Sequence, residues 1–524
     1  MSDKLVIAKK IYTLEKPGEF FTAMLIRDNK IVELTQKEKF SLERKSDYEL
    51  LDYSDFTIIP GFNDSHIHVM GYSNFLKNIN LIGCNKQEFI IRIKDKANSL
   101  ANDEWIVGRG WDHENFVDGT LPTKEDLDEV SQDHPVVLHR ICGHICVVNS
   151  KALRIANITN ETADPEGGKI DRNLVSGEIT GILRENAISL ITSSIPEMND
   201  KKKISFLKEG LRALSSKGLT SVQTVDENAY SYYKSLKDAN ELPLRVYLTS
   251  MAKELPDLIK KGIKSNEGDD FLRWGRIKLF SDGSLGAETA ALIDNYEKSS
   301  DNGMLIYSDE KMNNLISEAH AHGWQLEIHA IGDRSAKQVV EQYEKTKAYT
   351  NRAVLTHCQI LNKNIIDKMA SLGIIANIQP VFLNTDLHWA EKKIGKQRMK
   401  YSYAWKTLLQ HQILCAGGSD APVERPDPIL GIHAAVNRQD NNGVPTEGWY
   451  NNESLTVFEA VELFTSNAAF AEFQEHQKGK FLVNFLADFI ILNKDIFEIP
   501  KSEIRDIQVI ATYVDGKQIF KQNN

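Results

Sequence analysis

The sequence predicts an α/β protein: a (β/α)8 TIM barrel with an inserted subdomain after its first strand, and a small β-sandwich built from both termini. Two observations predict this fold. From about residue 57 onward, short apolar runs alternate with amphipathic stretches, which is typical of βα units and a parallel sheet. Both ends of the 524-residue chain instead contain short β segments separated by turns. We therefore expect the sandwich at residues 1–56 and 473–524, and the barrel at residues 57–472.

The barrel prediction depends on the number of apolar runs between the two terminal regions. Eight runs are suitable, and eight is the number of strands that closes this type of barrel. The predicted barrel strands are Thr57–Gly61, Leu219–Val225, Leu244–Ser250, Arg276–Phe280, Gln325–Ala330, Ala353–His357, Ile374–Gln379 and Ile413–Gly417.

The gap between the first and second barrel strands is too long for one βα connection. It contains two further apolar runs, Trp105–Arg109 and Pro135–Arg140. We therefore expect residues of about 80–215 to form a separate subdomain over the mouth of the barrel.

The terminal regions carry hairpin and strand signals. Met24–Leu34 alternates around Asp28-Asn29, a dipeptide that favours a tight turn. Because the chain begins and ends in β segments, we expect its two ends to pair. The C-terminal segments are Lys480–Leu482, Ala487–Leu492 and Val509–Tyr513.

Composition excludes several classes of partner. The net charge is −10 and the pI is about 5.8, which argues against nucleic acid or an anionic membrane as a partner. No run approaches the ~18 apolar residues of a transmembrane helix, and residues 1–10 lack the apolar core of a secretory signal. Five cysteines are too few for a disulfide scaffold, so Cys142 and Cys146 are expected to be buried small hydrophobes. A soluble protein in the reducing cytoplasm is predicted.

His66 and His68 follow the first predicted barrel strand. In a strand, side chains at positions i and i+2 point to the same side. Both imidazoles can therefore converge on one point, which is most simply a metal ion. Two ordinary histidines are the alternative for this pair alone.

Further polar residues recur at the ends of later barrel strands, where the active sites of such barrels lie. Lys278 lies in an otherwise apolar run, while His329, His357 and Asp420 end the fifth, sixth and eighth runs. Imidazoles and carboxylates bind zinc-class ions. Burial favours the neutral amine of Lys278, which can add carbon dioxide to form a bridging carbamate. Each residue taken alone has a structural alternative. Lys278 could be an ion-paired lysine, His329 and His357 could be core histidines, and Asp420 could cap the N-terminus of a helix. The ordered set predicts a metal site.

The order His-x-His, Lys, His, His and Asp resembles the amidohydrolase superfamily of metal-dependent hydrolases. The segment Pro60-Gly61-Phe62-x-Asp64-x-His66-x-His68 matches the opening motif of that superfamily. More narrowly, the chain is similar to the YtcJ-like branch, which includes N-substituted formamide deformylases. The segments that carry this narrower resemblance are Arg109–Asp112, Gly143-His144 with Asn149-Ser150, Lys278–Gly286 and His329–Asp333.

The resemblance implies two divalent metal ions, zinc for preference, although one ion stays an alternative. His66, His68 and Asp420 would hold one ion. The second would be held by His329 and His357, with N-carboxylated Lys278 bridging the two. A metal-activated hydroxide would attack the substrate, with Asp420 as general base and His144 as an additional donor to the oxyanion.

Residues of the inserted segment are expected to contact the substrate. The candidates are Trp111, Asp112, Arg184 and Glu185, together with His144. The alternative for Trp111 is a buried core tryptophan. The alternative for Arg184-Glu185 is a structural ion pair. Outside the insertion, His433 is expected to be structural or to support the site. Asp282 and Asp333 are expected to orient ligands or rim loops.

These features predict a metal-dependent amidohydrolase (EC 3.5-type) that cleaves the C–N bond of a small-molecule linear amide, including N-substituted formamides. A cyclic amide hydrolase and a mononuclear deaminase are the enzymatic alternatives. A non-catalytic scaffold would show lost ligands, and no ligand position departs from the superfamily pattern. The resemblance also makes a homo-oligomer an expectation, although the sequence indicates no interface.

Overall fold

The computed structural model describes residues 3–39, 48–140, 145–165 and 167–522. The chain divides into two compact units: residues 1–71 with 207–524, and residues 72–206. Each is described by itself. Within the described part of the chain, none of the helices is both long and apolar enough to cross a membrane.

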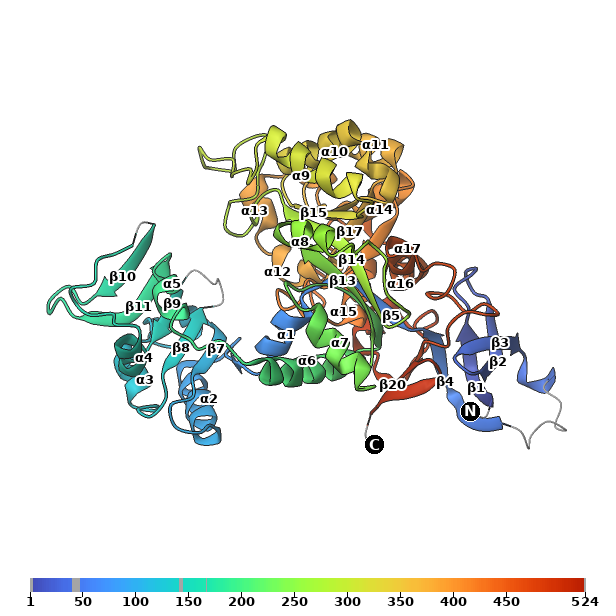
Figure 1. Ribbon diagram of the computed structural model, residues 1–524, viewed down its shortest axis with the longest axis horizontal. Helices are drawn as coiled ribbons and strands as arrows, with labels where there is room; N and C mark the ends of the chain where they lie inside the picture. Colours follow the sequence, from blue (N-terminus) through green and yellow to red (C-terminus); the bar gives the residue numbers. More distant parts are fainter. Residues whose placement is uncertain (1–2, 40–47, 141–144, 166, 523–524) are drawn as a thin grey trace. The chain divides into compact units, whose positions relative to one another are not determined.

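The first unit contains a parallel eight-stranded sheet that curves into a barrel (Figure 1). The predicted strands two to eight are present, with ends that shift by a few residues, which confirms the predicted fold class. In sheet order, the strands are β18 (Cys415–Gly417), β17 (Ile375–Ile378), β16 (Val354–His357), β15 (Leu326–Ala330), β14 (Leu272–Phe280), β13 (Arg245–Met251), β12 (Leu219–Val225) and β5 (Phe62–Ile67).

The prediction of Thr57–Gly61 as the first barrel strand was wrong. Residues 57–60 end β4 (Tyr48–Pro60) and pair with β19 in a different sheet. The barrel strand begins after the Pro-Gly break, at Phe62. Gly61 is needed at this transition because a Cβ there would lie 2.2 Å from Thr220 Cγ2. His66 therefore lies inside the first barrel strand and not beyond it.

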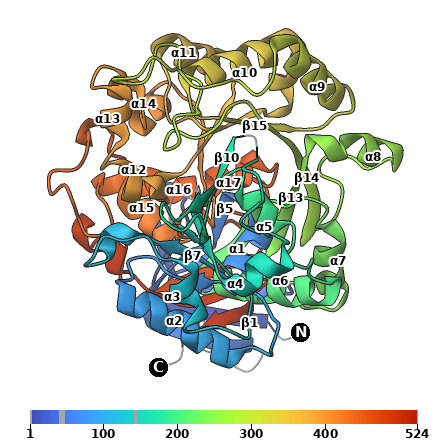
Figure 2. The same cartoon turned by 90° about the vertical axis from the view of Figure 1, so that its left-hand side faces the viewer.

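Helices cover the outside of the barrel strands, as Figure 2 shows for α7 to α11. Buried leucines on one face of α6 are typical of an amphipathic helix on a sheet. Helix α6 (Asp200–Ser215) belongs to this unit from Leu207 onward. The other main helices of this unit are α7 (Tyr230–Asp238), α8 (Leu255–Lys260), α9 (Asp309–Ala321), α10 (Asp333–Thr346), α11 (Lys363–Leu372), α14 (Trp405–Gln410), α15 (Pro428–Asn437), α16 (Val457–Leu463) and α17 (Ser466–Ala471).

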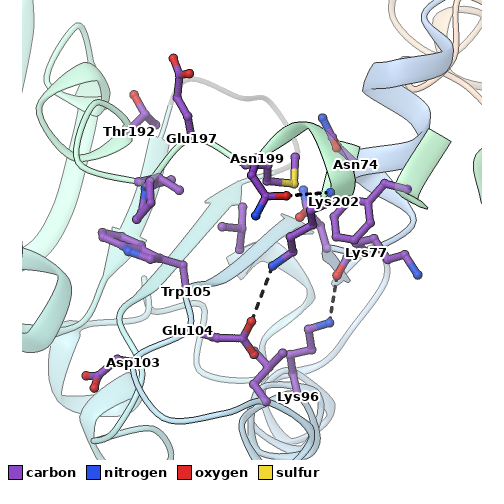
Figure 3. A pocket seen from close by; sticks show the side chains of 17 residues that line it. Asn74, Lys77, Lys96, Asp103, Glu104, Trp105, Thr192, Glu197, Asn199 and Lys202 are labelled. Carbon is purple, nitrogen blue, oxygen red and sulfur yellow. Dashed lines mark hydrogen bonds and ion pairs between the residues drawn. The ribbon is translucent and has the colours of Figure 1, made fainter. Parts of the chain in front are cut away.

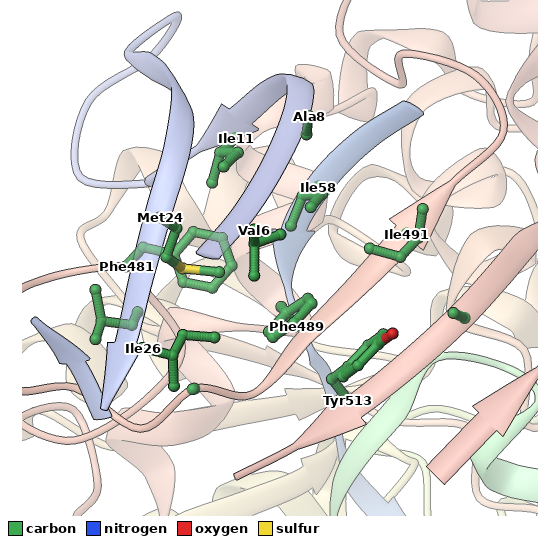
Figure 4. Packing of buried hydrophobic residues seen from close by; sticks show 13 residues of the cluster. Val6, Ala8, Ile11, Met24, Ile26, Ile58, Phe481, Phe489, Ile491 and Tyr513 are labelled. Atoms are coloured by element: carbon green, nitrogen blue, oxygen red, sulfur yellow. The ribbon is translucent and has the colours of Figure 1, made fainter. Parts of the chain in front are cut away.

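Both ends of the chain pair in one continuous seven-stranded sheet, as the terminal β segments predict. Lys480–Leu482 is not a strand, although Phe481 packs in the sheet's core. Figure 4 shows this core, in which Val6 and Ile58 from the N-terminal part pack with Phe489 and Tyr513 from the C-terminal part. The strand order is β21 (Lys517–Lys521), β20 (Val509–Val514), β19 (Phe489–Leu492), β4, β1 (Asp3–Tyr12), β2 (Phe20–Arg27) and β3 (Lys30–Thr35).

The second unit has its own six-stranded sheet and its own apolar cores. The helices α2 (Lys86–Ser99), α3 (Lys124–Asp128), α4 (Ser150–Ile155) and α5 (Ile188–Thr192) belong to this unit. The strand order is β10 (Gly168–Arg172), β11 (Ile179–Glu185), β9 (Ile145–Val148), β8 (Val136–Arg140), β7 (Ile106–Trp111) and β6 (Ile79–Asn80).

Candidate metal centre

Three metal-binding side chains meet at the carboxyl ends of the barrel strands. His66 is the fifth residue of β5, His357 ends β16, and Asp420 lies three residues beyond β18. One donor atom from each lies within 4.8 Å of the others, and all three residues are buried. Residues far apart in the sequence are therefore placed around one point by the parallel strands.

His66 and His68 both direct a ring nitrogen at the carboxylate of Asp420. The Nε2 atoms of His66 and His68 lie 3.3 and 3.1 Å from Asp420 Oδ1. This is the convergence expected of an i, i+2 pair, although His68 lies one residue past the end of β5.

The backbone at the β5–β18 seam fixes this arrangement. The Asp420 N–H donates to the carbonyl oxygen of His66 at 2.8 Å, and the His68 N–H donates to Ala421 at 2.9 Å. Gly418 permits the close approach, because a Cβ there would lie 2.7 Å from the His66 nitrogen and 2.9 Å from its carbonyl oxygen.

Two members of the cluster have strained backbones. His357 has a φ of 83° and Asp420 a φ of 55°, a region that residues other than glycine seldom occupy. Such strain persists where the surrounding structure holds it, and it is concentrated at functional sites.

Hydrogen-bond partners assign the ring tautomers of His68 and His357. His68 Nδ1 lies 2.9 Å from the Val225 carbonyl oxygen, which can only accept. His357 Nδ1 lies 2.7 Å from Gln379 Oε1. Both Nδ1 atoms therefore carry a proton, so Nε2 is the nitrogen of each ring that would bind a metal ion.

His329 has the opposite tautomer. Its Nε2 lies 3.0 Å from the Gly283 carbonyl oxygen, so Nε2 donates and Nδ1 carries the lone pair. Its ring centroid is 4.5 Å from that of His357, which places it at the same rim. Asp282, 3.2 Å from His329 Nε2, accepts the N–H groups of Ile331 and Gly332 and so holds the rim loops, the role expected of it.

Lys278 lies fully buried in β14, and its partner is Glu327, which the sequence analysis missed. The Lys278 amine donates to Glu327 Oε1 at 3.1 Å and lies 3.5 Å from His66 Nε2. Arg276 Nη1 donates to Glu327 Oε2 at 3.2 Å. A signal existed: Glu327 and His329 are at i and i+2 of one strand, the spacing that identified His66 and His68.

Electrostatics keep the two carboxylates ionised. Burial alone would raise the pKa of Asp420, but its contacts with His66 and His68 outweigh burial and hold that pKa well below its usual range. Burial likewise opposes ionisation of Glu327, whereas the charges of Lys278 and His66 hold its pKa far below the normal value.

The pKa values of His357 and His68 shift in opposite directions. Burial and the nearby His329 lower the pKa of His357 well below that of a free imidazole, which favours the neutral, ligating form. Burial also works against a charged His68, but its hydrogen bond to Asp420 outweighs burial and raises its pKa.

This donor set suits a zinc-class cation. Imidazole nitrogens with a free lone pair and one carboxylate oxygen are the ligands that such ions prefer. The donors come from separate strand ends and include no cysteine, which is typical of catalytic and not of structural zinc sites.

The residues expected to contact substrate have structural partners within the second unit. Trp111 is fully buried and its indole N–H donates to Leu138 at 2.7 Å. Arg184 makes a two-pronged ion pair with Asp171. These contacts support the core and ion-pair alternatives for Trp111 and Arg184.

The other predicted substrate-contacting residues are Asp112, Glu185 and His144. Asp112 pairs with Arg140 at 2.7 Å. Glu185 ends β11 in the left-handed region, with a φ of 49°. His144 lies outside the described residues.

His433, expected to be structural or to support the site, and Asp333, expected to orient ligands or rim loops, both contact backbone atoms. His433 is fully buried, with Nε2 3.3 Å from the Asp440 carbonyl oxygen. Asp333 Oδ1 accepts the N–H of Ile293 at 2.8 Å. Their roles in the described structure are therefore structural.

The second unit contains a cavity of about 900 Å³ (Figure 3). Trp105 and Phe206 line it together with several lysines. Lys202 pairs with Glu104 at 3.6 Å, and the Lys96 amine donates to the Lys77 carbonyl oxygen. None of the predicted site residues lines this cavity.

The barrel and its rim cluster define the class of protein: a metal-dependent hydrolase. The sequence profile of the Amidohydrolase family matches residues 49–520, so the chain belongs to that family. It is 32% identical to the Bacillus subtilis protein named "Putative amidohydrolase YtcJ", with 98% of each chain covered. It is 25% identical to the N-substituted formamide deformylase of Arthrobacter pascens, again over 98% of both chains.

A solved structure shares the fold. An uncharacterised metal-dependent hydrolase of Pyrococcus furiosus superposes with a TM-score of 0.79 and 27% sequence identity, covering 95% of this chain and all of the other. The family match and this likeness make the protein a metal-dependent hydrolase of the amidohydrolase superfamily, in the branch similar to YtcJ.

Proposed function

We propose that this protein hydrolyses the C–N bond of a small-molecule linear amide, and that N-substituted formamides are the first class to test. The observation that carries the proposal is the convergence of His66, His357 and Asp420 at the barrel rim, where enzymes of this fold act. The similarity to a formamide deformylase over nearly the whole chain supports the amide class.

The residues that would hold the metal are the six expected from the sequence. His66, His68 and Asp420 would bind one divalent ion and His329 and His357 a second, with N-carboxylated Lys278 between them. Zinc suits the donors best. When bound, such ions lower the pKa of water and polarise a carbonyl group.

The charges around Lys278 support its carboxylation. Arg276 faces the second oxygen of Glu327, so Glu327 keeps a cationic partner if Lys278 loses its charge. A buried ammonium that is not needed for pairing is costly. Carboxylation joins the lysine nitrogen to the carbon of carbon dioxide; starting from the ammonium, it releases two protons and replaces the buried cation by an anionic carbamate, which two metal ions would balance.

Asp420 is the proposed proton carrier. Its carboxylate is an anion at neutral pH and lies beside the proposed metal ligands His66 and His68, where it can accept a proton from an attacking water. As a water oxygen attacks the amide carbon, Asp420 takes the water proton. The C–N bond then breaks, and Asp420 delivers that proton to the leaving nitrogen. His144 is proposed as a further donor to the oxyanion.

A one-metal enzyme is the second candidate, as either a deaminase or a cyclic amide hydrolase. It is favoured by the contact of the Lys278 amine with Glu327 at 3.1 Å, since an unmodified lysine is satisfied there. The described ligand positions are complete, which argues against a non-catalytic scaffold.

The test combines metal-loaded protein with a substrate panel of N-substituted formamides, longer N-acyl amines, cyclic amides and amino-substituted heterocycles. Release of formate and an amine would support the proposal. Ammonia from the heterocycles would support the deaminase. An absence of turnover across the panel in protein that holds its metal would contradict the proposed amide class.

The cytoplasmic location and a homo-oligomer stay predictions. The four described cysteines, Cys84, Cys146, Cys358 and Cys415, are free and buried, as expected in a reducing compartment.

A further inference from the structure

Glu327 is a completely buried carboxylate among the residues proposed to bind metal. It lies on β15, two residues before His329, and its exposed fraction is 0%. Burying a carboxylate is costly unless it is paired and hydrogen-bonded. The contacts of Glu327 therefore indicate its role in the site.

The two oxygens of Glu327 have different partners. Oε2 accepts from Arg276, deep in the barrel. Oε1 lies 2.6 Å from His66 Nδ1 and accepts from the Lys278 amine and the Thr356 hydroxyl, each at 3.1 Å. One oxygen thus completes a structural ion pair, while the other contacts two proposed metal ligands.

The His66 contact determines which nitrogen of that ring can bind metal. The two atoms are not aligned for a hydrogen bond, but a lone pair on Nδ1 would be repelled by a carboxylate oxygen at 2.6 Å, so the contact favours a proton on Nδ1. Nε2, 3.3 Å from Asp420, is then the nitrogen that would bind a metal ion. Val225 and Gln379 give His68 and His357 the same tautomer.

The Lys278 contact sets the direction of that side chain. The amine is held between Glu327 Oε1 and His66 Nε2, which aims it at the cluster. If Lys278 becomes carboxylated, its nitrogen keeps one N–H, which can still donate to Glu327. The same oxygen can therefore orient the lysine in either form.

We propose that Glu327 is a positioning residue that prepares the metal site, because a single oxygen fixes the tautomer of His66 and the direction of Lys278. This inference rests on the proposed function, since it concerns the same metal site. Such outer contacts to metal ligands are typically worth ~10–100-fold in metal affinity.

A purely structural role is the alternative, and the chain contains a matched control. Glu472 is 2% exposed and, like Glu327, is paired with an arginine, a lysine and a neutral donor. Those partners are Arg273 and Lys478, each at 2.8 Å, and the Asn63 amide at 2.7 Å. None of the three is a proposed metal ligand.

The experiment compares Glu327→Gln and Glu472→Gln in the full-length protein. Zn²⁺ affinity is measured by chelator competition, site geometry by the absorption spectrum of bound Co²⁺, and stability by the melting temperature of the metal-free protein. Both variants are expected to melt earlier. Only Glu327→Gln should lose Zn²⁺ affinity, by ~10–100-fold, and change the Co²⁺ spectrum.

The inference is overturned if Glu327→Gln binds Zn²⁺ as tightly as wild type, or if Glu472→Gln weakens binding equally. Wild-type protein that binds no Zn²⁺ would instead contradict the proposed function. If Glu327→Gln does not fold, ¹H–¹⁵N spectra of Zn²⁺-loaded wild type decide the matter. A proton on His66 Nδ1 supports the inference, and a proton on Nε2 contradicts it.

Discussion

The main-chain N–H of Asp420 donates to the carbonyl oxygen of His66 at 2.8 Å. This bond joins the loop after the last barrel strand to the first strand. It places the carboxylate of Asp420 beside the rings of His66 and His68. The seam between β5 and β18 therefore also positions the candidate metal ligands. A change in the backbone at this seam should alter the affinity for a metal ion.

Gly418 should be essential for this seam. In Gly418→Ala, the new Cβ would meet the His66 backbone at under 3 Å, so the two segments must separate. We expect the affinity for Zn²⁺ to fall by about tenfold or more. Gly373→Ala is the control: Gly373 caps α11 at a φ of 64°, a Cβ added there would meet no other atom within 4 Å, and the change should cost stability without altering Zn²⁺ affinity.

Asp420→Asn should separate proton transfer from metal binding. The amide keeps an oxygen that can ligate but does not act as a base at neutral pH. We expect kcat to fall by ~10²–10⁴-fold, the usual contribution of a general base, while much of the metal stays bound. Elemental analysis and turnover are measured on the same sample. Equal loss of metal and activity would mean that Asp420 is mainly a ligand.

Asp488 should be critical for stability, because it pairs with buried Arg245 of β13. Arg245 Nε and Nη2 donate to the two oxygens of Asp488 at 2.6 and 2.8 Å. Asp515 also accepts from Arg245 Nη2, so Asp488→Asn removes one of two carboxylates from a buried guanidinium, and we expect a loss of ~1.5–3 kcal/mol in the free energy of unfolding.

Chemical denaturation tests this, with Asp238→Asn as the control. Asp238 pairs with Lys234 on the exposed face of α7, where ion pairs contribute little. A loss for Asp488→Asn no larger than that of the control would contradict the account.

Asp386 should make stability fall as the pH rises. Burial raises its pKa to about 7 from 3.8, although Tyr403 and Gln359 donate to it. Between these two values the folded protein holds a proton that the unfolded chain has lost, so raising the pH favours unfolding. The loss is complete above about pH 7 and amounts to roughly 4 kcal/mol.

Asp386→Asn should remove this dependence. We expect urea denaturation at pH 5 and pH 8 to give a smaller difference for the variant than for wild type. Identical pH differences in the two proteins would show that Asp386 does not carry the effect.

Much of the barrel could be predicted because apolar runs identify its strands: Leu219–Val225 is β12 without any shift in its ends. The first strand was misplaced because Thr57–Pro60 is equally apolar but pairs with β19 at the other end of the chain. Such long-range pairing leaves no local signal. It is the tertiary contact, and not the composition of the run, that determines the sheet.

The candidate ligand positions stand out in the sequence because each combines a polar residue with an apolar run. Glu327 faces the same side of its strand as His329, but it lies at the start of the apolar run and not at its end, so the pattern that marks the other positions does not include it. The partners of Trp111 and Arg184 could not be predicted, since Leu138 and Asp171 lie on neighbouring strands whose pairing the sequence does not reveal.

The central claim is the metal site, and its most direct test is metal content by elemental analysis with intact mass in neutral buffer. The account predicts about two zinc-class ions per chain and a mass gain of ~44 Da from carboxylated Lys278. One ion without added mass would favour the one-metal candidate. A chain that binds no metal, even after zinc is supplied, would contradict the account.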